Sequence, residues 1–341
     1  MLRLLAALTL AAMAAVTALA AEADAAELNI YSARHYDTDL SLYDRFTEET
    51  GIKVNLIEGD SDELIARIER EGRNSPADLL ITVDAGRLWR AEEKGLFQPV
   101  SSGILEERIP AHLRHPDGLW FGVSKRARII IYNKAAGTPE KLATYADLAD
   151  PVHKGEICMR SSSNLYNVSL LAAIVEHEGA EKAEAWTKGV VANFKREPQG
   201  NDTANVNAVA SGECRISLVN TYYVGRMLAS DDAAMREAAE KVAIVFPDQD
   251  GNGTHVNLSG AGVMKHAPNR DNAVKFIEFL TSDWAQLALT QMNHEYTAVP
   301  GISEESPVRG TGAFKEDELN ASALGRNQAE AVRIFDRAGW K

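Results

Sequence analysis

The hydrophobic positions of this chain alternate between the period of a strand and the period of a helix. Segment 27–33 is apolar and β-prone, and apolar residues at helical spacing follow over 40–50 until a glycine ends the pattern. A second strand is expected at 53–59, a second helix around 64–68 and a third strand at 77–85. This order of strands and helices predicts an α/β fold with a helix-covered sheet.

A long extended stretch at 118–134 interrupts the alternation, because two glycines precede the strongly β-prone run IIIY. We interpret it as a crossover from a first domain into a second. A turn-rich run at 248–254 leads into segment 255–266, which is expected to be the return crossover. Between and after these crossovers we expect strands at 155–162, 215–220 and 242–248, and helices at 165–175, 181–193, 272–280 and 285–292.

The crossovers predict two domains, one of 27–121 plus 255–303 and the other of 122–254 plus 304–341. Apolar residues near the C-terminus also predict one amphipathic helix that packs on the second domain; they are Leu324, Ala329, Val332, Phe335 and Trp340.

The N-terminus has the pattern of a secretory signal peptide. Arg3 precedes an uncharged, mostly Leu and Ala run that ends at Ala21, with small residues at suitable cleavage positions. A membrane anchor is the alternative, since the run is about long enough to span a bilayer. We expect a signal at 1–21, with cleavage as late as about residue 26, and export to the periplasm.

Composition limits the partners of the exported chain. The 341 residues carry a formal net charge of −13, which disfavours binding to nucleic acid or to an anionic membrane surface. The same charge is compatible with binding of cations.

Tyrosines recur at the points where a strand is expected to give way to a helix. They are His35-Tyr36, Tyr166 and Tyr222-Tyr223. In α/β sheets, ligands bind beyond the carboxyl ends of the strands, so these side chains are expected to converge from both domains. Phenolate is a hard anionic ligand, and several phenolates with one imidazole suit ferric iron better than zinc or copper(I).

The ordinary fate of a tyrosine is aromatic packing, and five other tyrosines fit that interpretation. They are Tyr31, Tyr43, Tyr132, Tyr145 and Tyr296. Other apparent metal motifs are incomplete. The turn at 248–254 imitates a calcium loop but has Ser259 where a glutamate is needed, and His112 and His115 lie between prolines in an expected surface loop.

Cys158 and Cys214 each lie in an expected strand that leads to a tyrosine. In an oxidising compartment they could form a disulfide that ties two parts of the site together. Two buried free thiols are the alternative, because strand adjacency is inferred.

The chain resembles the ferric-iron-binding periplasmic proteins of bacterial ABC iron importers. The resemblance covers the whole mature chain and is carried by NIYSARHYDTD, KRARIIIYNK, RSSSNLYNVSL, VNTYYVGRM and LGRNQAEAVRIFDRAGWK. It implies the two-domain, type II periplasmic-binding-protein clamshell with a ligand cleft between the domains. It also implies a monomer that delivers iron to the permease and ATPase subunits of an importer.

The resemblance implies iron ligation by Tyr36, Tyr166, Tyr222 and Tyr223, with His35 as a further ligand. The cargo would be Fe³⁺, with Fe²⁺ as the alternative oxidation state, and some family members add a synergistic anion or water. Four phenolates leave Fe³⁺ with one excess negative charge. Arg126 and Arg128 are the candidates to offset it, and the resemblance favours Arg128.

Two alternative functions remain at this stage. One is the same fold with an oxyanion or a small organic solute at the helix N-termini. The other is an iron-tyrosinate enzyme, against which the full set of protein ligands argues, since catalysis needs an open coordination position. No sequence motif of an ATPase or hydrolase is present, so any ATPase would be a separate subunit.

Overall fold

The computed structural model describes residues 26–34, 36–302 and 313–341. The strands of the described residues are β1 (Glu27–Ser32), β2 (Lys53–Glu58), β3 (Leu79–Thr82), β4 (Phe121–Asn133), β5 (Ile157–Cys158), β6 (Ile216–Asn220), β7 (Val242–Val245), β8 (Val256–Val263) and β9 (Tyr296–Thr297).

The α-helices of the described residues are α2 (Leu40–Thr50), α3 (Ser61–Glu71), α4 (Ala85–Glu93), α5 (Gly103–Arg108), α6 (Leu165–Glu178), α7 (Ala180–Ala192), α8 (Asp202–Ser211), α9 (Thr221–Ala229), α10 (Ala233–Glu240), α11 (Arg270–Leu280), α12 (Asp283–Asn293), α13 (Ser322–Arg326) and α14 (Gln328–Ala338). Short 3₁₀ helices are η1 (Asp37–Asp39), η2 (Gly72–Asn74), η3 (Ala111–Leu113), η4 (Lys134–Ala136), η5 (Ala146–Ala149) and η6 (Pro151–His153).

The strands form a mixed sheet with the order β2-β1-β3-β8-β4-β6-β5. β1 is parallel to β2 and β3, and β5 is parallel to β6, whereas β8 is antiparallel to both β3 and β4. The two parallel pieces are the βα units that the sequence predicts. The antiparallel strands β4 and β8 join them.

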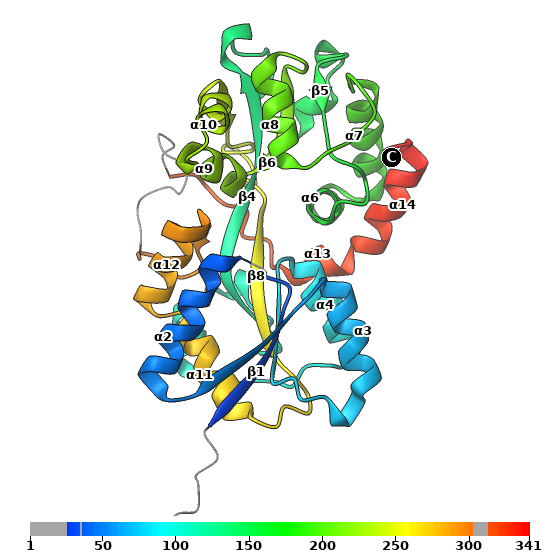
Figure 1. The fold of residues 1–341 in the computed structure, drawn as a ribbon. Helices are drawn as coiled ribbons and strands as arrows, with labels where there is room; N and C mark the ends of the chain where they lie inside the picture. The colour runs from blue at the N-terminus through cyan, green and yellow to red at the C-terminus, as the bar shows by residue number, and fades with distance from the viewer. Residues whose placement is uncertain (1–25, 35, 303–312) are drawn as a thin grey trace, which may run out of the picture.

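Figure 1 shows β4 and β8 running side by side between two groups of helices, α2, α3, α4, α11 and α12 on one side and α6 to α10 on the other. The first half of β4 pairs with β8, whereas its second half pairs with β6 and β7. The extended stretches predicted at 118–134 and 255–266 are therefore strands shared by both groups of helices. The domain boundaries drawn from them stay a prediction.

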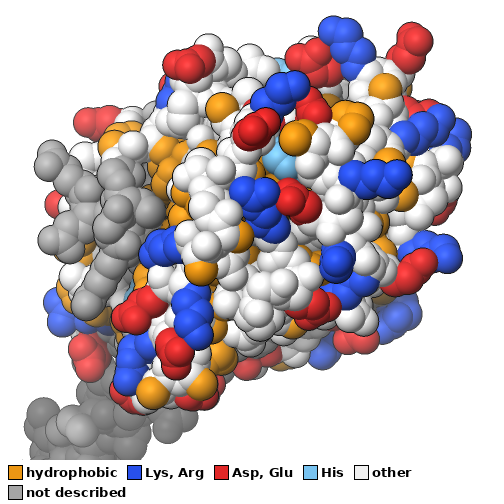
Figure 2. Space-filling model, turned by 90° about the horizontal axis from the view of Figure 1, so that it is seen from above, with side chains coloured by type: hydrophobic (Ala, Val, Ile, Leu, Met, Phe, Trp, Pro, Cys, Tyr) orange, Lys and Arg blue, Asp and Glu red, His pale blue; other side chains and the backbone are white. Residues whose placement is uncertain are grey.

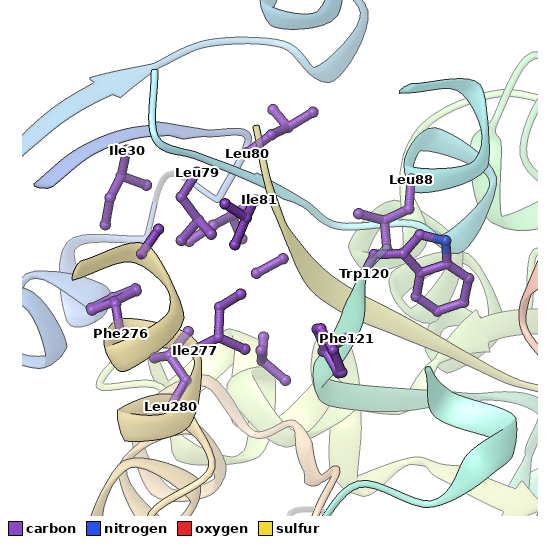
Figure 3. Close-up of a cluster of buried hydrophobic side chains, with 14 of the residues drawn as sticks. Ile30, Leu79, Leu80, Ile81, Leu88, Trp120, Phe121, Phe276, Ile277 and Leu280 are labelled. Carbon is purple, nitrogen blue, oxygen red and sulfur yellow. The ribbon is translucent and has the colours of Figure 1, made fainter. Parts of the chain in front are cut away.

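Each group of helices has its own apolar core. Around β1, β3, α4 and α11 the core is built by large buried side chains; those labelled in Figure 3 are Ile30, Leu79, Leu80, Ile81, Leu88, Trp120, Phe121, Phe276, Ile277 and Leu280. A second core surrounds Leu171 and Ile216, and a third surrounds Ile129 and Val219. Because Ile129, Ile130 and Ile131 are fully buried, the β-prone run of the sequence anchors the sheet between the second and third cores.

The sequence prediction of a single C-terminal helix is wrong. The segment forms α13 and α14, separated at Asn327, and Ala329 and Val332 are exposed. The buried positions of α14 include Ala331, Ile334 and Phe335. A break in a helix resets the phase of its apolar face, so a pattern counted through Asn327 selects the wrong positions.

The face viewed in Figure 2 carries acidic and basic side chains interspersed with apolar ones, without a broad area of a single charge. Among the described residues, no helix combines the length and the apolar character that crossing a bilayer requires.

Candidate metal centre

The predicted tyrosines lie where strands end. β6 ends at Asn220, and Tyr222 and Tyr223 occupy the first turn of α9. Tyr166 is in the first turn of α6, whose N-terminal residue Asn164 accepts a hydrogen bond from the backbone N–H of Asn167 at 3.3 Å. The exposed N–H groups of a helix start favour negative charge. Both helices therefore carry their phenols in a first turn, the end of a helix that favours negative charge.

Tyr36 follows β1 and immediately precedes η1. Its predicted neighbour in the site, His35, lies outside the described residues. The ring of Tyr36 packs under the guanidinium group of Arg226 at 4.3 Å from the ring centroid, and the same guanidinium lies 5.1 Å from the ring centroid of Tyr222. Arg226 thus brings a residue that follows β1 next to a residue that follows β6.

The other phenols are also in contact. The hydroxyl oxygens of Tyr166 and Tyr222 are 3.2 Å apart, and the ring centroids of Tyr222 and Tyr223 are separated by 4.3 Å. All four predicted tyrosines are therefore linked by short contacts, although three separate segments supply them. The structure brings together the tyrosines that the sequence singled out.

Burial changes the acidity of two of these phenols. Tyr222 is 2% exposed, and burial first, followed by the proximity of Tyr166, Tyr36 and Tyr223, raises its pKa well above the ordinary value of 10.0. Burial likewise raises the pKa of Tyr166, while Arg126 opposes the effect. Without a cation Tyr166 and Tyr222 keep their protons at neutral pH, because a buried phenolate is poorly solvated and two adjacent phenolates would repel each other.

Arg126 is a buried cation that lowers the pKa of the nearby Tyr166 and Tyr222 and so opposes the effect of burial. Its guanidinium donates to Glu295 at 3.0 Å, to Ser259 at 2.7 Å and to the carbonyl of Val83 at 3.1 Å. Burial alone would lower the pKa of Arg126, but Glu295 and then the tyrosines outweigh it and raise the pKa. Its Nε has no hydrogen-bond partner among the described residues. Arg126 is therefore placed to offset negative charge on the phenols.

Arg128 has a different set of partners. Its guanidinium donates to Asp202 at 2.8 Å, to Asn220 at 3.2 Å and to Asn167 at 2.7 Å. Asn167 is adjacent to Tyr166, and Asn220 lies two residues before Tyr222. Arg128 thus connects the starts of α6 and α9, which positions the helices that carry the phenols.

Three arginines near the tyrosines were missed in the sequence analysis, among them Arg34, whose guanidinium lies 5.1 Å from the ring centroid of Tyr36. Arg226 follows Tyr222 by four residues in α9, a spacing that places both on one helix face, but the helix expected after the strand at 215–220 was given no bounds. Arg160 pairs with Asp202 at 3.2 Å, and Asp202 together with Tyr223 outweighs the effect of burial and raises the pKa of Arg160. No sequence pattern points to Arg160, because its approach to Tyr223 depends on the tertiary fold.

The two cysteines are joined by a disulfide between Cys158, the last residue of β5, and Cys214, two residues before β6, with Cα atoms 5.9 Å apart. The bond ties together the parallel strands that lead to Tyr166 and Tyr222. Among the described His, Cys, Asp and Glu side chains, three ligand atoms approach closely enough for a metal only at Cys158, Glu213 and Cys214. Because both sulfurs are already bonded to each other, that group is a poor metal site.

His112 and His115 each contact a carboxylate, Glu316 at 3.2 Å and Glu92 at 3.0 Å respectively. His115 is buried, so its predicted place in a surface loop is wrong. The five tyrosines assigned to packing do pack, since Tyr31, Tyr43 and Tyr145 are buried and Tyr132 and Tyr296 are partly buried.

Fold and site together define a binding protein of the periplasmic type, in which two α/β units share a pair of long strands. A profile of the family described as "Bacterial extracellular solute-binding protein" matches residues 41–321. The chain belongs to this family, whose members bind solutes and are not enzymes.

Individual relatives cover nearly the whole chain. The "Iron uptake protein A1" of Synechocystis sp. is 58% identical over 315 residues, which are 92% of this chain and 88% of the relative. The structure of the Trichodesmium protein called IdiA or FutA, "in complex with iron and citrate ligands", is 53% identical with a TM-score of 0.90, over 92% of this chain and 100% of that one. The ferric binding protein from Campylobacter jejuni is 44% identical with a TM-score of 0.87, over 92% and 100% of the two chains.

Proposed function

We propose that this protein captures Fe³⁺ in the periplasm and delivers it to an ABC permease. The ligands are the phenolate oxygens of Tyr36, Tyr166, Tyr222 and Tyr223, joined by His35. The proposal rests above all on the 3.2 Å separation of the Tyr166 and Tyr222 hydroxyl oxygens. Two buried phenols at this distance cannot both ionise unless a cation lies between or beside them.

The charge of the surrounding side chains supports a trivalent cargo. Four phenolates and Fe³⁺ leave one excess negative charge. Because Arg126 is already paired with Glu295, the stacked Arg226 supplies the single positive charge that offsets it. A divalent ion would leave a larger excess. Hard anionic ligands also prefer the higher oxidation state, so reduction to Fe²⁺ weakens binding and provides one route of release.

Names of the relatives support the same cargo. "Iron uptake protein A1" from Synechocystis sp. and the ferric binding protein from Campylobacter jejuni are named for iron. The Trichodesmium structure contains citrate besides iron, so an exogenous anion is a candidate additional ligand in this chain too.

Delivery follows from the family and the predicted architecture. We infer that the N-terminal segment is a cleaved signal peptide, that the two proposed domains close on the iron, and that the closed monomer docks on the permease of an importer. Its ATPase is a separate subunit. Release then follows opening of the domains, reduction of the iron or protonation of the phenolates.

Titration of the apo-protein with chelated ferric iron tests the proposed cargo and ligands. We expect a visible phenolate-to-iron charge-transfer band that saturates at one iron per chain, and Tyr222→Phe should weaken or shift it. Tyr132→Phe is the matched control, because Tyr132 lies on β4 with its hydroxyl 3.1 Å from Thr138 and away from the other phenols. Absence of the band in the unmodified protein would overturn the proposal and favour an anionic or organic solute.

A further inference from the structure

A cavity of about 520 Å³ lies apart from the tyrosine cluster. It is enclosed by the second half of α6, the start of α7, η5 with the preceding Tyr145, the turn that precedes β8, and Asp317. This volume is in the range of cavities that bind small organic molecules. Its wall is apolar along Leu170, Ala173 and Ile174, with Tyr145 and Trp186 as aromatic members.

The aromatic part of the wall is held in place by hydrogen bonds. The indole N–H of Trp186 donates to the carbonyl of Tyr145 at 2.7 Å, and the hydroxyl of Tyr145 donates to the carbonyl of Arg128. The same hydroxyl accepts the backbone N–H of His255 at 3.2 Å. These hydrogen bonds fix the aromatic part of the cavity wall before any ligand binds. Aromatic side chains suit an apolar or a cationic ligand.

Some charged side chains of the cavity wall have ion-pair partners, and one does not. Lys182 pairs with Glu178 at 3.0 Å, and His177 contacts Asp317 at 2.8 Å. The other oxygen of Asp317 accepts the backbone N–H of Leu319 at 3.0 Å. None of the ion pairs within the described parts of the chain includes Asp248. The lining therefore has an acidic group in excess.

Asp248 is half-buried and its backbone has a φ of +59°, a left-handed conformation that is uncommon outside glycine. The N–H groups of Gly251 and Gly253 both donate to its carbonyl at 2.9 Å, which fixes the turn. Burial raises the pKa of Asp248 to about 6; a hydrogen bond from the backbone of Tyr145 opposes this shift, and the nearby Asp147 and Asp317 add to it. Its ionised form thus lacks a cation that a ligand would supply.

A second polar group of the wall, unlike Asp248, has a buried atom without a hydrogen bond. His255 is 4% exposed, and its Nε2 has no hydrogen bond to any group in the described chain. Burial lowers its pKa to about 4, so the imidazole is neutral at pH 7 and has an acceptor nitrogen to offer. A metal ion does not fit the site, because among described residues these side chains do not bring three ligand atoms together.

We propose that this cavity is a second binding site, for a small primary amine with an apolar body. The ammonium group of the ligand faces Asp248 and His255, and the apolar body packs on Leu170, Ile174 and Trp186. This site is independent of the iron ligands, although α6 carries residues of both.

Binding is measured by fluorine NMR on the unmodified apo-protein with fluorine-labelled benzylamine, phenethylamine and cyclohexylmethylamine. Labelled benzyl alcohol is the neutral control. We expect saturable binding of at least one amine and about tenfold or weaker binding of the alcohol, since a charged hydrogen bond is lost. No saturable binding by any of the amines, or equal binding of the alcohol, would overturn the proposal.

Asp248→Asn removes the charge at a residue type that tolerates a left-handed backbone, and it should weaken amine binding about tenfold. Asp250→Asn makes the same charge change two residues away on an exposed side chain outside the cavity, and it should leave binding unchanged. Equal effects of the two substitutions would contradict the site. Tyr222→Phe should retain amine binding, so the result does not depend on the iron proposal.

Discussion

The hydroxyl oxygens of Tyr166 and Tyr222 lie 3.2 Å apart, although the two residues start helices that follow different strands. Burial and mutual proximity raise the pKa of both phenols. In the apo-protein the pair shares a hydrogen bond between neutral groups. A highly charged cation favours the ionised form instead, because it displaces the protons of the phenols. Its attraction for both phenolates then outweighs their mutual repulsion.

This pair makes iron binding depend on pH. Each phenol that becomes a ligand releases a proton, so acidification should lower the affinity by about tenfold per pH unit for every proton released. Competition with a chelator of known proton dependence, repeated between neutral and mildly acidic pH, measures the number of protons. Tyr166→Phe should reduce that number by one. An affinity independent of pH would be incompatible with phenolate ligands.

Arg126 and Arg128 lie two residues apart on β4, and both are buried, yet we expect different consequences of their loss. Arg126→Gln removes the cation beside the phenols and should weaken iron binding about 10–100-fold, with a shift of the charge-transfer band. Arg128→Gln breaks the bonds to Asp202 and Asn167, so it should lower the melting temperature with less change in the band. Titration and thermal unfolding of both variants separate the roles. A band shift with Arg128→Gln alone would reverse them.

His255 predicts a loss of stability in acid. Its pKa in the folded protein is lowered from 6.5 to about 4 by burial, so the unfolded chain binds the proton at a higher pH than the folded one. The contribution of neutral His255 to the free energy of unfolding is therefore fully present above pH 6.5 and is lost as the pH falls toward 4. The loss is on the order of 3 kcal/mol at most. Urea unfolding of the apo-protein at several pH values gives the free energy of unfolding as a function of pH. This free energy should change less steeply with pH in His255→Gln than in the unmodified protein. His266→Gln, at an exposed position, is the control, and an equal flattening there would exclude His255 as the source.

We expect Phe276, in the core shown in Figure 3, to contribute strongly to the stability of the folded protein. Its side chain is fully buried and packs edge-on against Phe46 with ring centroids 4.9 Å apart. Phe276→Ala should reduce the free energy of unfolding by about 3–5 kcal/mol. Leu40→Ala, at a side chain that is 51% exposed, should change it by less than about 0.5 kcal/mol. Chemical denaturation of both variants tests the difference.

Much of the fold could be predicted because apolar periodicity is strong in its buried elements. The helix predicted from apolar spacing up to Gly51 is α2, which ends at that glycine with a φ of +71°. The long crossover was visible as a β-prone run because β4 is buried over most of its length. The helix α8 was missed, since its buried face includes polar residues such as Asp202 and Asn205.

The candidate site could be predicted only in part. Tyr36, Tyr166, Tyr222 and Tyr223 have a signal in the sequence because each follows an expected strand. The pairing of Arg126 with Glu295 and the approach of Arg226 to Tyr36 have none, since the partners are far apart in the chain. Tertiary structure alone distinguishes the charge role of Arg126 from the positioning role of Arg128.

Crystals of the iron-loaded protein, with diffraction data collected on both sides of the iron absorption edge, locate the iron without assuming its ligands. We expect one anomalous peak per chain within bonding distance of the phenolate oxygens of Tyr36, Tyr166, Tyr222 and Tyr223. A peak at any other place in the molecule, or none in protein shown to contain iron, would contradict the proposed ferric tyrosinate site.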